Sequence, residues 1–103
     1  MIQLSACLIV KNEAILLPHC LESICTFVDE IIVVDTGSSD NTVEIAHSYG
    51  AQIYRFAWVN DFSAARNESL RHAKGEWILY IDADEAIDAL NAAKIREIIT
   101  RKD

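Results

Sequence analysis

Four hydrophobic runs follow one another along the chain, and a segment with a mixed, helix-like pattern separates each run from the next. The runs are "LSACLIV" (4–10), "EIIVVD" (30–35), "AQIYRF" (51–56) and "EWILYID" (76–82). Short runs rich in β-branched and aromatic residues are typical of buried strands. The second run is apolar between two acidic ends, as expected for a strand covered on both faces. The pattern therefore predicts four strands in a largely buried sheet.

The segments between the runs have the spacing of helices, with apolar residues every three or four positions. Pro18 suits a first helical turn, and Gly50 and Gly75 are placed to end two helices. Because strands that alternate with helices form βαβ units, the chain is predicted to be a single α/β domain, residues 1–103, with a parallel sheet of about four strands flanked by helices. The helices are predicted from about Pro18 to Ile24, over 41–49, within 61–75, and from Leu90 to about Arg101.

Composition and charge narrow the class of protein. With 51% hydrophobic and 24% charged residues, the chain is predicted to be an ordinary globular domain. No apolar run approaches the roughly 18 residues of a membrane span. The net charge of -7 argues against nucleic acid as a partner, because binding to a phosphate backbone requires a basic face. An acidic protein can still bind an anionic ligand when a divalent cation bridges the two.

The three cysteines, Cys7, Cys20 and Cys25, lack the paired spacing of a zinc site and are expected to be reduced thiols. The first residues show neither a basic region nor a small-residue cleavage site, so no signal peptide is predicted. Both features favour a cytoplasmic location.

Polar clusters follow three of the four predicted strands. Residues 11–13 ("KNE"), 35–40 ("DTGSSD") and 82–85 ("DADE") come directly after the first, second and fourth strands or complete them. In a parallel sheet all strands end at the same edge, and ligands bind outside that edge where the strand order reverses. We therefore expect the three clusters to meet in one crevice.

Asp82 and Asp84 form the most informative pair among these acids. One residue separates them, and the hydrophobic run in front of them fixes their position. Paired carboxylates with open coordination positions suit Mg²⁺ or Mn²⁺ bound jointly with a phosphate. The alternative is that these acids are solvated or cap the next helix, because acids are common in loops.

Asp35, Arg66 and the two tryptophans each allow two interpretations. Asp35 could accept hydrogen bonds from the glycine turn that follows it, or from an N–H or hydroxyl group of a ligand. Arg66 could form a surface ion pair with Glu68, or hold a base or phosphate near the acids. For Trp58 and Trp77, packing in the core or at its rim is favoured over stacking against a ligand.

Three longer stretches, "SACLIVKNEAILLPHCLESI", "DEIIVVDTGSSDNTVEIA" and "FSAARNESLRHAKGEWILYIDADE", resemble the inverting family-two glycosyltransferases of the GT-A fold. The resemblance spans nearly all of residues 3–88 and includes four motifs in the order of the family. It implies a Rossmann-like GT-A nucleotide-binding half. It also implies transfer of a sugar from a nucleotide diphosphate, usually UDP-linked, to an acceptor hydroxyl, with Mg²⁺ or Mn²⁺ on the diphosphate.

The resemblance further implies roles for individual residues. Asp35 would hydrogen-bond the base, and Arg66 would lie against the nucleotide. Asp82 and Asp84 would be the metal-binding D-x-D, with Asp82 near the ribose and Asp84 reaching the ion. Many relatives carry a second acid where this chain has Thr36, so base recognition departs from the family at that position. The nucleoside pocket would be lined by the end of the first strand and the residues after it: Ile9, Val10, Lys11 and Glu13.

Catalysis is expected to need residues beyond these. In the family, the acid that deprotonates the acceptor hydroxyl lies well downstream of the D-x-D, so the base is expected beyond Asp103 and the acceptor-binding half outside this chain. One alternative is a non-catalytic nucleotide-binding or self-associating α/β module, whose uncovered apolar edge would favour a homodimer. Another is a phosphohydrolase, suggested by "VVDTG" but disfavoured because such enzymes need an acid where this chain has Gly37.

Overall fold

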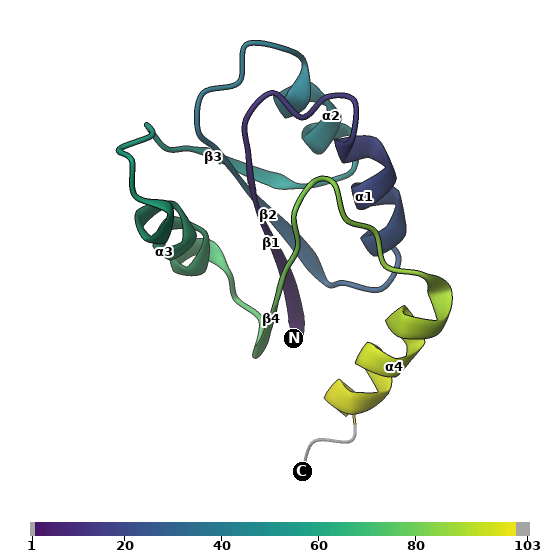
Figure 1. Cartoon of the computed structure of the whole chain (residues 1–103). Helices are drawn as coiled ribbons and strands as arrows, with labels where there is room; N and C mark the ends of the chain where they lie inside the picture. Colours follow the sequence, from purple (N-terminus) through teal and green to yellow (C-terminus); the bar gives the residue numbers. More distant parts are fainter. Residues whose placement is uncertain (1, 101–103) are drawn as a thin grey trace.

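The computed structural model describes residues 2–100 and shows a sheet with helices on both faces (Figure 1). All four strands are parallel, in the order β3-β2-β1-β4. The predicted α/β class and four-stranded parallel sheet are therefore confirmed. The elements are β1 (Leu4–Val10), α1 (Leu17–Ile24), β2 (Glu30–Asp35), α2 (Thr42–Ser48), β3 (Gln52–Arg55), α3 (Phe62–His72), β4 (Trp77–Tyr80) and α4 (Ala89–Thr100).

The strand order reverses beside β1, because β2 and β3 lie on one side of it and β4 lies on the other. Right-handed crossovers then place α1 and α2 on one face of the sheet and α3 on the opposite face (Figure 1). In agreement, α1 contacts α2, whereas α3 contacts β1 and β2. The carboxyl end of the sheet near β1 is thus the position where α/β proteins bind ligands.

Strand pairing sets the level at which each strand ends. β1 and β2 stay in register up to the pair Val10 and Asp35, so their carboxyl ends lie side by side. β4 is shorter, and its last pair with β1 joins Tyr80 to Cys7. The N–H of Ile81 donates to the carbonyl of Cys7 at 3.3 Å. The chain that leaves β4 therefore runs beside the last residues of β1.

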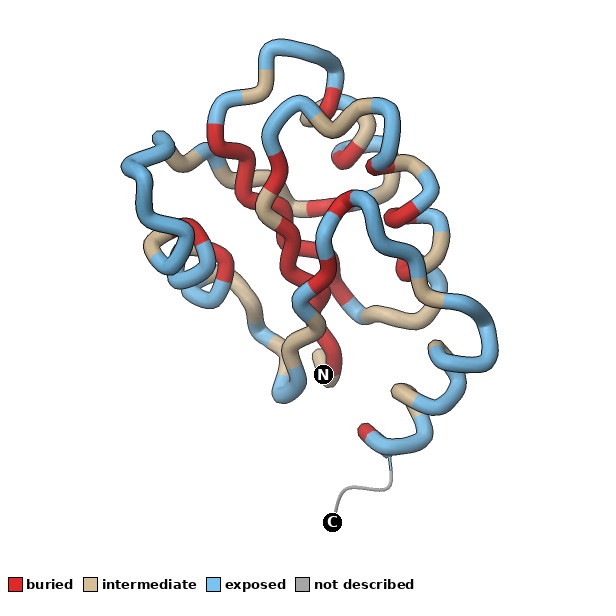
Figure 2. The backbone as a smooth tube through the Cα atoms, viewed as in Figure 1, coloured by how far each residue is buried: buried red, intermediate tan, exposed pale blue. Residues whose placement is uncertain are grey.

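The main core lies between the sheet and α1. Ala6, Leu8 and Val10 of β1 belong to the same buried cluster as the apolar stripe of α1. In Figure 2 the buried residues follow β1 and β2 through the centre of the molecule. The opposite face is thinner, because α3 buries only Ala65 and Ser69. The predicted stripe of α1 is confirmed, and all of its members are fully buried: Leu17, Cys20, Leu21 and Ile24.

A buried carboxylate joins three strands to the loop before β4. Glu30 is only 8% exposed and accepts hydrogen bonds from Ser5 Oγ (2.6 Å), Lys74 N (2.6 Å) and Gln52 Nε2 (3.1 Å). Three donors stabilise the charge of a group that would otherwise be costly to bury. Glu30 therefore fixes the point at which the chain enters β4.

Gly75 lies beside this carboxylate and does not end a helix, contrary to the prediction. α3 ends at His72 with Ala73 as its C-cap, and the φ of Gly75 lies outside the left-handed region. Its N–H donates to Ser5 Oγ at 2.8 Å, and a Cβ atom at position 75 would lie 2.7 Å from Ser5 N. Glycine is required here because the loop backbone passes directly over β1. By contrast, Gly50 has a φ of +81° after α2, as a helix-ending glycine does.

α4 is attached to the sheet mainly through Arg96. Its guanidinium group donates to Phe27 O (3.2 Å), Gln3 Oε1 (3.3 Å) and Asp29 Oδ2 (3.4 Å). The pKa of the Asp29 carboxyl is lowered, first by the hydrogen bond from Leu4 N–H and further by Gln3 N–H and Arg96. Arg96 therefore links α4 to the residues that precede β1 and β2, at the amino end of the sheet.

An apolar groove separates α4 from the edge strand β4. The volume of this groove is about 130 Å³. The sequence predicted that α4 ends at about Arg101, a position that lies outside the described residues. None of the helices within residues 2–100 has the length and apolar character needed to cross a lipid bilayer. The groove is lined by Leu4, Trp77, Ile78, Leu79, Ile95, Ile98 and Ile99.

Candidate functional site

The loops after β1 and β2 interlock at the carboxyl edge of the sheet through Asn12. This residue has a φ of +53°, and its Oδ1 accepts from Ser39 N at 2.7 Å while its own N–H donates to Ser38 Oγ at 2.9 Å. The N–H of Glu13 donates to Thr42 Oγ1 at 2.9 Å. The first two predicted clusters therefore meet, and they do so mainly through an asparagine that the sequence interpretation left without a role.

Asp35 stabilises the glycine turn that follows it. The side chain is 1% exposed, and its carboxylate accepts from Gly37 N (3.3 Å), Ser38 N (3.1 Å) and Ser38 Oγ (2.5 Å). Gly37 has a φ of +126°, which favours glycine at this turn. Of the two interpretations of Asp35, the structural one is confirmed. The residue also lines a cavity of about 240 Å³ beside Thr36 and Arg55, so contact with a ligand stays a prediction.

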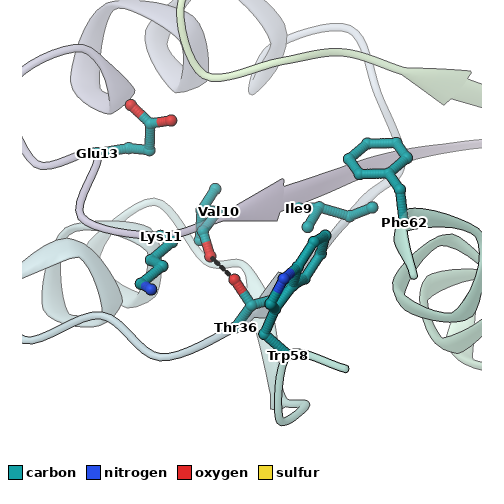
Figure 3. Close-up of a pocket in the computed structure, with 7 residues that line it drawn as sticks. All are labelled: Ile9, Val10, Lys11, Glu13, Thr36, Trp58 and Phe62. Atoms are coloured by element: carbon teal, nitrogen blue, oxygen red, sulfur yellow. Dashed lines mark hydrogen bonds between the residues drawn. The ribbon is translucent and has the colours of Figure 1, made fainter. Parts of the chain in front are cut away.

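A second cavity, of about 260 Å³, opens between the end of β1 and the start of α3 (Figure 3). Thr36 lines both cavities, and its Oγ1 donates to the carbonyl of Val10 at 3.2 Å. Two aromatic side chains also line the 260 Å³ cavity, namely Trp58, which is 44% exposed, and Phe62, which is 48% exposed. We refer to this cavity as the β1 pocket. Its lining contains all four residues predicted for the nucleoside pocket, and it consists of Ile9, Val10, Lys11, Glu13, Thr36, Trp58 and Phe62.

A short turn before α3 positions the aromatic side chains. The Nε1–H of Trp58 donates to Asn60 Oδ1 at 3.0 Å, and Asn60 has a φ of +57°. Asp61 caps α3 by accepting from Ser63 N (3.0 Å) and Ala64 N (3.3 Å). The sequence favoured packing in the core or at its rim for Trp58; the core is excluded, because the side chain is exposed and lines the pocket, and contact with a ligand stays a prediction. An Asn-Asp pair before a helix indicates such a turn, and this signal identifies the tryptophan as a loop residue.

Arg66 lies between two aromatic rings. Its guanidinium carbon is 4.7 Å from the ring centroid of Tyr80 and 5.1 Å from that of Phe62. The ion pair with Glu68 that the sequence allowed is not formed, because Glu68 pairs with Arg71 and His72 on the same helix. Within residues 2–100, the charges of Arg66 and Lys11 are in no ion pair. Both cations are therefore available to an anionic ligand at this edge of the sheet.

The third cluster forms a tight turn on the other side of β1. Continuing the β1–β4 register past Cys7 and Tyr80 brings Asp82 level with Ile9. Ala83 is 3% exposed, whereas Asp82 and Asp84 on either side of it are exposed. Both carboxylates are thus on the solvent side of the turn, which fits a D-x-D and solvated loop acids equally, so the metal-binding role stays a prediction.

Cys20 of α1 packs under this turn. Its Sγ lies 3.5 Å from the carbonyl oxygen of Asp82, within hydrogen-bond reach of the thiol. The pKa of the Cys20 thiol is raised to about 11, mainly by burial and further by the acids Glu85, Asp82 and Asp84. The thiol therefore stays protonated at neutral pH and can act as the donor.

The acids of the turn do not form a complete metal site by themselves. Within residues 2–100, no group of three His, Cys, Asp or Glu side chains could hold a metal ion. In the same range, the carboxylates of Asp82 and Asp84 form no hydrogen bond or ion pair. The chain thus offers two uncommitted hard-oxygen donors, and further ligands would come from a bound anion and water.

Comparison with known proteins adds independent information. The model of the family described as Glycosyl transferase family 2 matches residues 5–101. The chain is 53% identical over 87 residues to a TPR repeat-containing protein of Synechococcus elongatus, and 40% identical over 93 residues to the SPbeta prophage-derived glycosyltransferase SunS of Bacillus subtilis. These alignments cover 84% and 88% of the chain and 22% of each relative, so the chain spans about a fifth of their length.

Solved structures share the fold. TarS 1–349 of S. aureus superimposes with a TM-score of 0.83 at 23% identity, over 95% of this chain and 32% of that protein. Glucosyl-3-phosphoglycerate synthase of Mycobacterium tuberculosis, in complex with Mn²⁺, UDP and glucosyl-3-phosphoglycerate, has a TM-score of 0.71 at 25% identity, over 82% of this chain and 36% of that protein. The family model covers nearly the whole chain, and the curated relative SunS is 40% identical to it. The chain therefore belongs to glycosyl transferase family 2.

Proposed function

We propose that the chain binds a nucleotide-diphosphate sugar, specifically a UDP-sugar, at the β1 pocket and at the turn of residues 82–85 after β4, which we call the acid turn, for transfer of the sugar to an acceptor hydroxyl. One observation carries the proposal: all four residues predicted for the nucleoside pocket line a single cavity at the strand end. The UDP held by the related glucosyl-3-phosphoglycerate synthase supports the choice of nucleotide.

The pocket supplies apolar walls for a base and a polar end for phosphates. Trp58 and Phe62 line the pocket and are both partly exposed, and a heterocyclic base would stack well on such an aromatic side chain. Lys11 and Arg66 provide the positive charge that a diphosphate requires. Asp35 lines the neighbouring cavity that shares Thr36 with the β1 pocket, and three of its roughly four acceptor sites are used within its turn; the fourth would accept from an N–H group of a base that reaches this cavity.

Asp82 and Asp84 fit a divalent cation of the Mg²⁺ or Mn²⁺ type. Both are exposed carboxylates just after β4, and such ions prefer hard oxygen ligands from a few carboxylates together with phosphate oxygens and water. Asp84 would contact the ion, and Asp82 would lie between the ion and the ribose. When bound, the cation would neutralise charge on the diphosphate leaving group.

The complete transfer reaction requires a base and an acceptor site, which we place outside these 103 residues. The chain spans about a fifth of the length of its curated relatives. Transfer of a sugar to an acceptor by a whole protein is therefore part of this proposal. The single-domain boundary at 1–103 and the cytoplasmic location stay predictions.

A phosphohydrolase based on Asp35 has little support. A nucleophilic carboxylate needs an open approach to phosphorus, whereas this side chain is 1% exposed and its oxygens accept three hydrogen bonds. Phosphate-ester turnover that is lost in Asp35→Asn would reverse this conclusion.

Isothermal titration of the chain with UDP, with and without Mn²⁺, tests the proposal. We expect binding that Mn²⁺ strengthens and that Asp84→Ala weakens to the metal-free level. Glu44→Ala removes an exposed acid from α2 and serves as the charge-matched control. Absence of UDP binding, or binding that Asp84→Ala leaves unchanged, would refute the proposed site.

A further inference from the structure

The acid turn is closed by two reciprocal hydrogen bonds between its first and last residues. The N–H of Glu85 donates to the carbonyl of Asp82 at 2.9 Å, and the N–H of Asp82 donates to Glu85 Oε1 at 2.8 Å. The second bond folds the Glu85 carboxylate back toward the end of β4. The glutamate of a capping box makes the same bond as Glu85, in which a side-chain oxygen accepts from the backbone N–H three residues earlier.

α1 holds the backbone on both sides of this turn. Cys20 Sγ lies 3.5 Å from the carbonyl of Asp82, and Ser23 Oγ accepts from the N–H of Ile87 at 3.1 Å. Ser23 Oγ in turn donates to the carbonyl of Cys20 at 2.7 Å. One turn of α1 therefore holds the backbone at both ends of the acid turn. The backbone is therefore fixed toward α1, and the carboxylates of Asp82 and Asp84 remain on the open side.

We infer that Glu85 is a positioning residue, which acts by holding Asp82 and Asp84 in place and not by ligating the cation. This inference rests on the proposed function, because Asp82 and Asp84 are the cation ligands only if that function is correct. Two observations carry it. One oxygen of Glu85 is committed to the N–H of Asp82. In addition, α1 holds the backbone on both sides of the turn through Cys20 and Ser23.

The chemistry of the turn explains why a glutamate is suited to this task. A side-chain oxygen of Glu85 accepts from the N–H of Asp82, and the side chain has the length to span residues 82–85. An alanine would leave the Asp82 N–H without its acceptor and allow the turn to relax. Residues that orient metal ligands typically change metal affinity about 10–100-fold when they are substituted.

The test compares Glu85→Gln with Glu85→Ala in the 103-residue chain. Glutamine keeps an oxygen that can accept from Asp82 N–H, but it removes the charge that would make the side chain a cation ligand. UDP is titrated calorimetrically with and without Mn²⁺, and free Mn²⁺ is followed by electron paramagnetic resonance. We expect Glu85→Gln to retain the Mn²⁺-dependent affinity and Glu85→Ala to lower it about tenfold.

Each result separates this inference from the proposed function. Absence of UDP binding to the unsubstituted chain refutes the proposed function, and the inference with it. If the unsubstituted chain binds, an equal loss in both variants shows that the charge itself is needed and overturns only the inference. An unchanged affinity in Glu85→Ala overturns it as well. Should Glu85→Ala fail to fold, Glu85→Gln decides alone, because loss of Mn²⁺-dependent binding there contradicts the positioning role and retention supports it.

Discussion

Gly75→Ala should destabilise the chain by more than its small size suggests. The added Cβ atom would lie 2.7 Å from both Ser5 N and Ser5 Oγ and 3.0 Å from Trp77 O, whereas ordinary contacts begin near 3.4 Å. Two of these neighbours are backbone atoms of adjacent strands and cannot rotate away. The loop would have to lift from β1, which weakens the 2.8 Å hydrogen bond from Gly75 N to Ser5 Oγ.

The size of this effect follows from three contributions. Overfilling a closely packed site costs about 1–3 kcal/mol, and a weakened hydrogen bond adds about 1 kcal/mol. Replacing glycine by alanine lowers the entropy of the unfolded chain and returns about 0.5 kcal/mol. We therefore expect a loss of about 1.5–3.5 kcal/mol in unfolding free energy, equivalent to a fall in Tm of roughly 7–17 °C for a domain of this size.

Chemical denaturation and thermal unfolding, followed by circular dichroism, measure the loss. Gly50→Ala is the matched control, because a Cβ atom there has no neighbour within 4 Å and pays only for a φ of +81°. That conformational penalty is about 1–2 kcal/mol. A Tm of Gly75→Ala equal to or above that of the unsubstituted chain would refute the steric reasoning, and so would a smaller loss than Gly50→Ala shows.

Three further predictions concern the pocket, the pH dependence and association. Trp58→Ala is expected to weaken UDP binding about tenfold, because stacking contributes about 1–3 kcal/mol per base. Trp77→Phe on the edge strand is the control and should leave the calorimetric affinity unchanged. If the two variants bind UDP with equal affinity, Trp58 does not contact the ligand. The pKa of Asp29 is lowered by folding, so the ionised carboxyl stabilises the folded chain fully above the unfolded-state pKa of about 3.9, and this stabilisation is lost as the pH falls through the folded-state pKa. The unfolding free energy of Asp29→Asn should therefore vary less with pH in acid than that of the unsubstituted chain. Parallel curves of unfolding free energy against pH for the two proteins would contradict this. Light scattering is expected to report a dimer or a larger species, because β4 is an edge strand among the described residues and lies beside an apolar groove; a monomer at every concentration would contradict self-association.

The sequence predicts the elements of this fold well, because their signals are local. The apolar runs at 4–10 and 30–35 coincide with β1 and β2, and the helices predicted at 41–49 and within 61–75 contain α2 and α3. Chain order then places the polar clusters at one edge of the sheet. That step needs only the rule that parallel strands end on the same side.

What the sequence could not predict depends on contacts between distant residues. The steric role of Gly75 depends on Ser5, which lies seventy positions earlier, and no local pattern distinguishes it from a helix-ending glycine. The exposure of Trp58 follows from the turn at Asn60, while hydrophobicity alone favours burial. Asp35 looks the same in sequence whether its carboxylate faces a ligand or its own turn.

Asn12 has a consequence for how this site can change over time. Since hydrogen bonds of Asn12 and Glu13 join the loop after β1 to the segment after β2, an insertion in either loop would displace both. The turn at 57–61 has no such link to those two loops among the described residues. Variation in loop length, and with it new ligand preference, should therefore accumulate in the turn at 57–61, while the loops after β1 and β2 keep their length.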